Sequence, residues 1–299
     1  MAVGPSGLAR RLSRALVVGA SGQVGGALCR VLPDAAGTYR SRPAPGLRQL
    51  DASDAVAFRR ALDETGARVV FYPAAEPNVD WCESHPAEAE DANLGPFRVA
   101  LGVAAERDAF FVAYSSDYVF DGKNGPYAET DPVSPISVYG RIKVRIEQEA
   151  IAAGAAVVRT TVVFGFERGE PRNFVLRLVR SLANGESVRV PTDQVGTPTY
   201  ADDLATASGA IGGARATGVW NVAGPERMSR VELARRTAAA FDLRAWLIEP
   251  VSTAALGQVA RRPLSSGLRI DKLRERFGIT MRSVDAGLAD LRAIIDRHE

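Results

Sequence analysis

The sequence predicts an α/β protein built on a doubly wound parallel sheet, and three observations lead to this class. Short β-rich runs alternate with helical patterns, which is typical of a parallel sheet with helices on both faces. The first apolar run passes directly into a glycine-rich turn, as in Rossmann folds. After about residue 165, segments that mix Pro, Gly and polar residues replace this alternation, and we interpret them as a smaller C-terminal substrate-binding portion.

These patterns divide the chain into three parts. Residues 1–14 combine arginines with small residues and show no period, so we expect a loose N-terminal extension. Residues 15–165 form the expected Rossmann domain, and residues 166–299 form the mainly substrate-binding portion, with some segments returning to the Rossmann core. The predicted strands are 15–20, 36–39, 68–72, 110–116 and 155–164, and the predicted helices lie around 23–32, 53–65, 86–106 and 137–153.

Composition excludes several classes of protein. The net charge is +2 and the chain has no long basic or acidic block, so neither nucleic acid nor a membrane surface is an expected partner. The apolar run ALVVGA is too short for a membrane span or a signal peptide, and we expect a cytoplasmic protein. Cys29 and Cys82 form neither a CxxC nor a zinc spacing, which fits a reducing compartment.

Histidine chemistry is also disfavoured. His85 is followed by Pro86 and His298 is the penultimate residue, and these are the only two histidines. A histidine metal site or a Ser/His triad therefore has almost no residues from which to form, and we expect no metal. An acid or base in this chain is expected to be another residue type.

The glycine-rich turn predicts a dinucleotide site. In GASGQVGG, Gly19, Gly22 and Gly25 give the spacing G-x-x-G-x-x-G between a strand and a helix. Such glycines let the backbone approach a pyrophosphate, whose charge then lies at the helix N-terminus. A tight turn that only needs small residues would show the same pattern, but the strand before it and the helix after it favour dinucleotide binding.

The end of the second predicted strand indicates NADP(H). The sequence there reads GTYRSRP, in which Arg40, Ser41 and Arg42 can bind a 2′-phosphate and no carboxylate is available for the 2′-hydroxyl of NAD. The alternative is that both arginines face water. Asp51 is predicted either to accept a hydrogen bond from the adenine amino group or to cap the following helix.

A tyrosine and a lysine are the candidates for a general acid that is not histidine. In SVYGRIK, Tyr139 and Lys143 lie one helical turn apart, so the ammonium should favour the phenolate and lower the pKa of Tyr139 from about 10. The same ammonium could hold the nicotinamide ribose. A surface pair would have this spacing too, but the strand FFVAYSS ends in Ser116 at the carboxyl edge where such sheets bind ligands. Ser116 can then hydrogen-bond a substrate carbonyl while Tyr139 protonates it.

With these residues in place, the chain resembles the extended short-chain dehydrogenases/reductases, and within them the dTDP-4-dehydrorhamnose reductase family of sugar-nucleotide ketoreductases. The similar stretches are GASGQVG, AAEPNVDWCE, SSDYVFDG, SVYGRIK, VVRTTVVFG, DQVGTPTYADDLA and RRPLSSGLRIDKL. The resemblance implies a catalytic triad of Ser116, Tyr139 and Lys143.

The resemblance also implies two sets of binding residues. The cofactor would be lined by Gly19, Ser21, Gly22, Gln23, Val24, Arg40, Ser41, Arg42, Asp51, Ala74 and Ala75, together with Tyr139 and Lys143. Asn93 matches an asparagine that helps to organise the active-site helix. Asp117 and Tyr118 should face the sugar, and Arg262 would reach the nucleotide diphosphate. Val162 stands where these reductases commonly have a tryptophan that packs against the sugar, and Ser116 stands where threonine is usual.

The expected function is NADPH-dependent reduction of the 4-keto group of an NDP-4-keto-6-deoxyhexose in deoxysugar biosynthesis. A dehydratase would typically have Asp-Glu after the catalytic hydroxyl residue, but here Asp117 precedes Tyr118. An epimerase retains NAD tightly, which Arg40 and Arg42 do not favour. The alternative from another class is an NADP-binding regulatory subunit that resembles the β subunit of methionine adenosyltransferase. A nucleotide sugar is the expected partner. The sequence is compatible with a homodimer and does not determine the oligomeric state.

Overall fold

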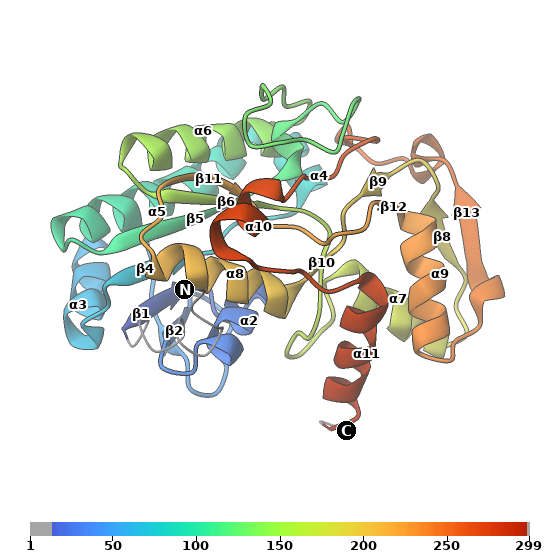
Figure 1. The fold of residues 1–299 in the computed structure, drawn as a ribbon, viewed down its shortest axis with the longest axis horizontal. Coiled ribbons are helices and arrows are strands. Elements are labelled where there is room, and N and C mark those ends of the chain that lie inside the picture. The colour runs from blue at the N-terminus through green and yellow to red at the C-terminus, as the bar shows by residue number, and fades with distance from the viewer. Residues whose placement is uncertain (1–13, 298–299) are drawn as a thin grey trace.

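Residues 14–297 are described by the computed structural model, in which a seven-stranded parallel sheet lies at the centre (Figure 1). The strand order reverses beside β1, which is the position where open α/β sheets bind ligands outside their carboxyl ends. The predicted doubly wound sheet is therefore confirmed. In spatial order the strands are β11 (Gly218–Asn221), β6 (Ala156–Thr160), β5 (Phe110–Ser116), β4 (Val69–Tyr72), β1 (Ala15–Val18), β2 (Ala36–Tyr39) and β3 (Arg48–Gln49).

Alternate side chains of each central strand enter two different cores. In β1, Ala15 and Val17 pack on one face of the sheet, while Leu16 and Val18 pack on the other. The first face is covered by α2 (Gln23–Val31) and α8 (Ala201–Gly213). The second face is covered by α3 (Ala55–Thr65), α5 (Pro86–Glu106) and α6 (Val138–Ala152), with α4 (Val79–Ser84) beside α5. Burial on both faces explains why these strands read as continuous apolar runs.

Local capping signals set where the helices begin. Ser137 accepts a hydrogen bond from Gly140 N (3.2 Å) and so caps α6. Asp54 caps α3 by accepting from Val56 N (2.9 Å) and Ala57 N (3.0 Å). The capping alternative for Asp51 is therefore wrong, because its carboxylate instead closes a turn with Ser53.

The predicted strand 155–164 is wrong in one respect, because it is broken in the middle. β6 ends at Thr160, and β7 (Val163–Phe164) pairs with β10 (Thr199–Tyr200) outside the main sheet. Between them Val162 has φ of 47°, which a β-branched residue rarely adopts. The run of valines carries no glycine or proline that could have marked this bend.

Beyond residue 165 the chain forms smaller cores and also returns to the main sheet. α8 and β11 belong to the Rossmann unit, and α10 (Asp271–Phe277) packs beside β11. The remaining elements lie on the right in Figure 1. They are α7 (Phe174–Ala183), β8 (Val188–Pro191), β9 (Val195–Gly196), β12 (Met228–Ser229), α9 (Arg230–Ala240), β13 (Ile248–Val251), α11 (Val284–Ile295) and the short 3₁₀ turns Ala245–Leu247 and Thr253–Leu256. The predicted division at residue 165 stays a prediction, and the predicted extension 1–14 falls almost entirely outside the described residues.

Within residues 14–297, no helix combines the length and the apolar character that a bilayer crossing requires.

An ion pair between two buried side chains, Glu147 and Arg159, anchors α6 to the sheet. Glu147 accepts hydrogen bonds from Arg159 Nε (2.8 Å) and Nη2 (2.6 Å), and from Ser115 Oγ (2.5 Å). Both side chains of this ion pair are only 4% exposed. The pair therefore ties α6 to β6 and β5 through contacts that water does not screen.

We predict strong coupling between these two residues. Glu147→Gln or Arg159→Met alone leaves an unpaired buried charge or an incomplete network, and each should lower the free energy of unfolding by about 3–5 kcal/mol. The double variant should lose much less than the sum. Urea unfolding of the four proteins measures this, and additive losses would show that the pair does not act as a unit.

Candidate active site

Tyr139 and Lys143 lie on the first turns of α6, facing the carboxyl end of β5. Val138 N donates to Glu83 Oε2 (2.8 Å), which adds a second anchor for the start of this helix beside Ser137. Lys143 Nζ donates to Tyr114 O in β5 (3.0 Å) and lies 5.5 Å from the centre of the Tyr139 ring. The predicted pair is therefore brought to the predicted sheet edge.

Ser116 and Asp117 mark the point where β5 ends and a 3₁₀ turn, η1 (Asp117–Val119), begins. Ser116 Oγ donates to Asp117 Oδ1 (3.1 Å). The buried Asp117 also accepts from Thr161 Oγ1 (2.8 Å) and from Ser266 Oγ (2.7 Å). Burial raises the pKa of Asp117, and these three hydroxyl donors oppose that effect. Asp117 thus joins Ser116 to distant parts of the chain, and its contact with a sugar stays a prediction.

The expected lowering of the Tyr139 pKa is wrong for this structure. Burial raises the pKa of Tyr139 above its ordinary value, and the negative charges that Tyr118, Cys82 and Asp117 can carry add to the effect. The Tyr118 ring meets Tyr139 edge-on at 5.6 Å, which helps to exclude water. Burial also lowers the pKa of Lys143 to about 8, against an opposing effect of Glu147. Desolvation outweighs the attraction that the helical spacing predicts.

The glycine-rich turn fits a dinucleotide, as judged by the space that its glycines leave. A Cβ on Gly25 would lie 2.4 Å from Gly19 O, and Gly19 itself has φ of 88°. A Cβ on Gly19 would lie 3.1 Å from Ala74, in the loop after β4. Asn93 holds that loop by accepting from Glu76 N (3.0 Å). Two loops thus meet closely at the switch point, and Gly22 caps α2 with no side chain over its free N–H groups.

The other predicted cofactor residues divide between this turn and the end of β2. In the amide orientation that pairs donors with acceptors, Gln23 donates to Val163 O and accepts from Gly165 N and Asn173 Nδ2, at 3.1–3.2 Å. Val24 packs against the core, and Ala75 is exposed beside the half-buried Ala74. Arg40, Ser41 and Arg42 follow β2 and are exposed, and the exposed Asp51 follows β3.

Arg262 and Arg230 lie near Tyr118, and Arg177 lies near Arg230. Arg262 Nη2 donates to Asp80 Oδ2 (2.7 Å), while its Nη1 is buried with no hydrogen-bond partner among the described residues. The charges of Arg262 and Arg230 both lower the pKa of Tyr118, which burial otherwise raises. Burial lowers the pKa of Arg230, and the neighbouring Arg177 adds to this effect. Sequence reasoning missed Arg177 and Arg230, because isolated arginines in helical segments carry no distinctive pattern.

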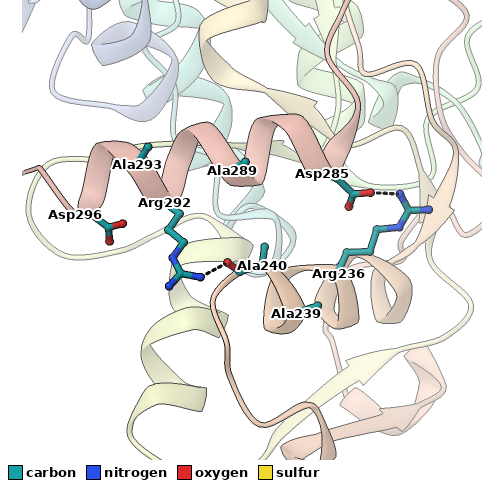
Figure 2. Close-up of a pocket in the computed structure, with 8 residues that line it drawn as sticks. All are labelled: Arg236, Ala239, Ala240, Asp285, Ala289, Arg292, Ala293 and Asp296. Atoms are coloured by element: carbon teal, nitrogen blue, oxygen red, sulfur yellow. Dashed lines mark hydrogen bonds and ion pairs between the residues drawn. The ribbon is translucent and has the colours of Figure 1, made fainter.

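A groove of about 620 Å³ lies elsewhere, between α9 and α11 (Figure 2). Alanines of both helices line it, and Figure 2 shows Arg236 directed to Asp285 and Arg292 directed to Ala240 O (2.9 Å). Its arginines are therefore already paired with acidic side chains, whereas Arg177 and Arg230 form no ion pair among the described residues. Among residues 14–297, no group of three or more His, Cys, Asp or Glu side chains could hold a metal ion.

Comparison with known proteins places this site in a family. The profile described as the RmlD substrate binding domain matches residues 13–296. The chain belongs to the RmlD substrate-binding domain family. A dTDP-4-dehydrorhamnose reductase of Burkholderia thailandensis, a relative of this RmlD-family chain, is 32% identical over 89% of this chain and 93% of its own. The methionine adenosyltransferase 2 subunit beta of Danio rerio is 30% identical over 90% and 86%.

The fold of this RmlD-family chain also matches solved structures. A dTDP-4-dehydrorhamnose reductase of Bacillus anthracis, solved in complex with NADP, superposes with a TM-score of 0.81 at 25% identity. The match covers 94% of this chain and 99% of that one. The resemblance drawn from the sequence motifs is thereby confirmed, whereas the role of each site residue stays a prediction.

We predict a pH-dependent contribution of Lys143 to stability in the cofactor-free protein. Its folded pKa of about 8 lies below its ordinary value of 10.5, so between these values the unfolded chain binds a proton that the folded chain does not. The stability of wild type should therefore rise relative to Lys143→Met by up to about 3 kcal/mol across this interval. Below pH 8 the difference should be constant.

Urea unfolding at pH 7 to 10.5 measures this difference. Lys123→Met removes an exposed lysine and serves as the control for general effects of pH. A difference between wild type and Lys143→Met that does not change with pH would show that the ammonium is not destabilised by burial.

Proposed function

We propose that this chain is an NADPH-dependent reductase of a nucleotide-linked 4-keto-6-deoxyhexose. The observation that carries the proposal is that Tyr139 and Lys143 of α6 lie beside β5, the strand that ends in Ser116 near the switch point of the sheet. Relatives in the family are named as reductases, and one related structure holds NADP, which supports an NADP-dependent oxidoreductase.

Each site residue would have a separate role in carbonyl reduction. NADPH, held by the glycine-rich turn and by Arg40 and Arg42, supplies the hydride when bound. The raised pKa of Tyr139 keeps the phenol protonated near neutrality, so it can give a proton to the carbonyl oxygen of the sugar. Ser116 Oγ would hydrogen-bond the same oxygen. Lys143, beside the tyrosine ring, balances the phenolate that is left and orients the nicotinamide ribose.

The arginines beside Tyr118 support a nucleotide diphosphate as the handle of the substrate. Arg177, Arg230 and Arg262 come from separate segments, and among the described residues only Arg262 of these three forms an ion pair, with Asp80. Guanidinium groups bind phosphate oxygens with paired hydrogen bonds, and burial strengthens such contacts. Val162 does not provide the tryptophan surface expected in this family. We therefore propose the class of sugar and not an individual sugar.

A second candidate is a regulatory NADP-binding subunit. The similarity to the zebrafish methionine adenosyltransferase 2 subunit beta favours it, since that match covers 90% of this chain. Such a protein would bind NADP and act through a partner enzyme rather than by turnover. NADPH oxidation with a panel of 4-keto-6-deoxy sugar nucleotides separates the two functions, because a regulator would oxidise no NADPH with any of them.

We predict that Tyr139→Phe lowers kcat for the keto sugar about 100- to 10,000-fold while NADPH binding stays nearly intact. The phenol hydroxyl supplies the proton, but the ring still fills its place beside Tyr118. Lys143→Ala should reduce both kcat and NADPH affinity, because its ammonium serves both groups. Steady-state kinetics and fluorescence titration measure the two quantities. A Tyr139→Phe protein with the normal rate would remove tyrosine as the acid.

We predict that Arg40→Ala/Arg42→Ala weakens NADPH binding far more than NADH binding. Each charge-assisted contact to a 2′-phosphate contributes on the order of 1.5–3 kcal/mol, and solvent exposure reduces this value. Isothermal titration with both dinucleotides measures the effect. Equal affinity of the wild-type chain for NADH and NADPH would contradict the assignment of these arginines.

A further inference from the structure

The loop between β7 and α7, residues 165–173, lies against the glycine-rich turn (Figure 1). Gln23 of α2 bonds Gly165 N and Asn173 Nδ2 at the two ends of the loop. In Figure 1 this yellow-green loop runs beside α2 before it enters α7. A segment from beyond the predicted domain boundary is thus attached to the turn that is expected to hold a pyrophosphate.

Glu167 gives this loop a fixed shape. Its Oε2 accepts hydrogen bonds from Arg172 N (2.9 Å), Asn173 N (2.9 Å) and Asn173 Nδ2 (3.0 Å). Asn173 in turn caps α7 by accepting from Leu176 N (3.0 Å). Burial raises the pKa of Glu167, whereas its bonds to Asn173 and the charge of Arg42 oppose this effect. The Glu167 carboxylate therefore bonds backbone and amide groups of the loop itself. The guanidinium groups of Arg168 and Arg172 make their hydrogen bonds outside the loop.

Two arginines of the loop reach the two segments assigned to the dinucleotide. Arg172 Nη2 donates to Ser21 O (3.2 Å) within the glycine-rich turn. Arg168 Nη1 donates to Pro45 O (3.4 Å) in the segment that follows Arg40 and Arg42. One guanidinium group therefore lies at the pyrophosphate turn, and the other lies beside the segment assigned to the 2′-phosphate.

These arginines have free capacity for an anion. In the part of the chain that the structure describes, neither Arg168 nor Arg172 forms an ion pair, and each donates a single side-chain hydrogen bond. Arg180, which follows on α7, differs because it pairs with Glu170. A guanidinium group has five N–H donors, so most donors of Arg168 and Arg172 remain for phosphate oxygens.

We propose that the loop 165–173 is the outer wall of the dinucleotide site, in which Arg172 binds the pyrophosphate and Arg168 binds the 2′-phosphate. This inference depends on the proposed NADPH function and deepens it. Because the pyrophosphate is common to NADH and NADPH whereas the 2′-phosphate belongs to NADPH alone, the two arginines must differ in the cofactors that they affect.

The test is to measure dissociation constants for NADPH and NADH by isothermal titration, without any sugar substrate. Arg172→Ala should weaken both dinucleotides about tenfold, and Arg168→Ala should weaken NADPH about tenfold while changing NADH less than twofold. Arg235→Ala removes an exposed arginine on α9 that also forms no ion pair with any residue between 14 and 297, and it should leave both constants within about twofold. Thermal unfolding confirms that each variant is folded.

A fourth variant separates phosphate binding from a bracing role. Arg172→Gln keeps a donor for Ser21 O but loses the charge, so its affinities should stay as weak as those of Arg172→Ala. Restored affinity would overturn the inference, as would Arg168 and Arg172 variants that match Arg235→Ala. A wild-type chain that binds neither dinucleotide would overturn the proposed function as well, whereas normal wild-type binding with unchanged variants would overturn this inference alone.

Discussion

The position of α6 depends on how three buried charged side chains find partners between the helix and the sheet. Lys143, Glu147 and Arg159 are all buried, and each charge alone would be costly there. Glu147 therefore binds Arg159 and Ser115, and Lys143 donates to the carbonyl of Tyr114. Because β5 supplies partners for both Lys143 and Glu147, the register of the helix against this strand is fixed. Tyr139, one turn before Lys143, follows to the carboxyl end of the sheet.

Another buried acidic side chain, Asp117, extends this constraint to the C-terminal portion. Asp117 binds hydroxyl groups of Ser116, Thr161 and Ser266, which come from β5, from the bend after β6 and from the segment RRPLSSG. Hydroxyl groups satisfy a carboxylate without neutralising it, so each of the three bonds matters for keeping the charge. A displacement of the segment that carries Arg262 would thus change the position of Asp117 and, through it, of Ser116. The binding of the diphosphate and the carbonyl would then be linked through one carboxylate.

The sequence predicts those elements whose position depends on residues close together in the chain. Helix 86–106 and strand 110–116 agree with the structure residue for residue, since Pro86 starts the helix and the aromatic run FFVAYSS fills both faces of the sheet. The spacing of Tyr139 and Lys143 predicts one face of a helix, and both lie on α6, but the direction of the tyrosine pKa depends on burial, which spacing does not contain. Arg172 and Ser21 are separated by 151 positions, so only the folded chain brings them together.

The strained bend at Val162 is the local feature that gives this distant contact its geometry. A β-branched residue with φ of 47° costs on the order of 1–3 kcal/mol, and such strain persists only where the surrounding structure demands it. The bend ends β6 and turns β7 out of the main sheet toward β10. The loop 165–173 begins directly after β7, so the bend that interrupts the predicted strand also sets the direction in which the chain enters the loop that contacts Ser21.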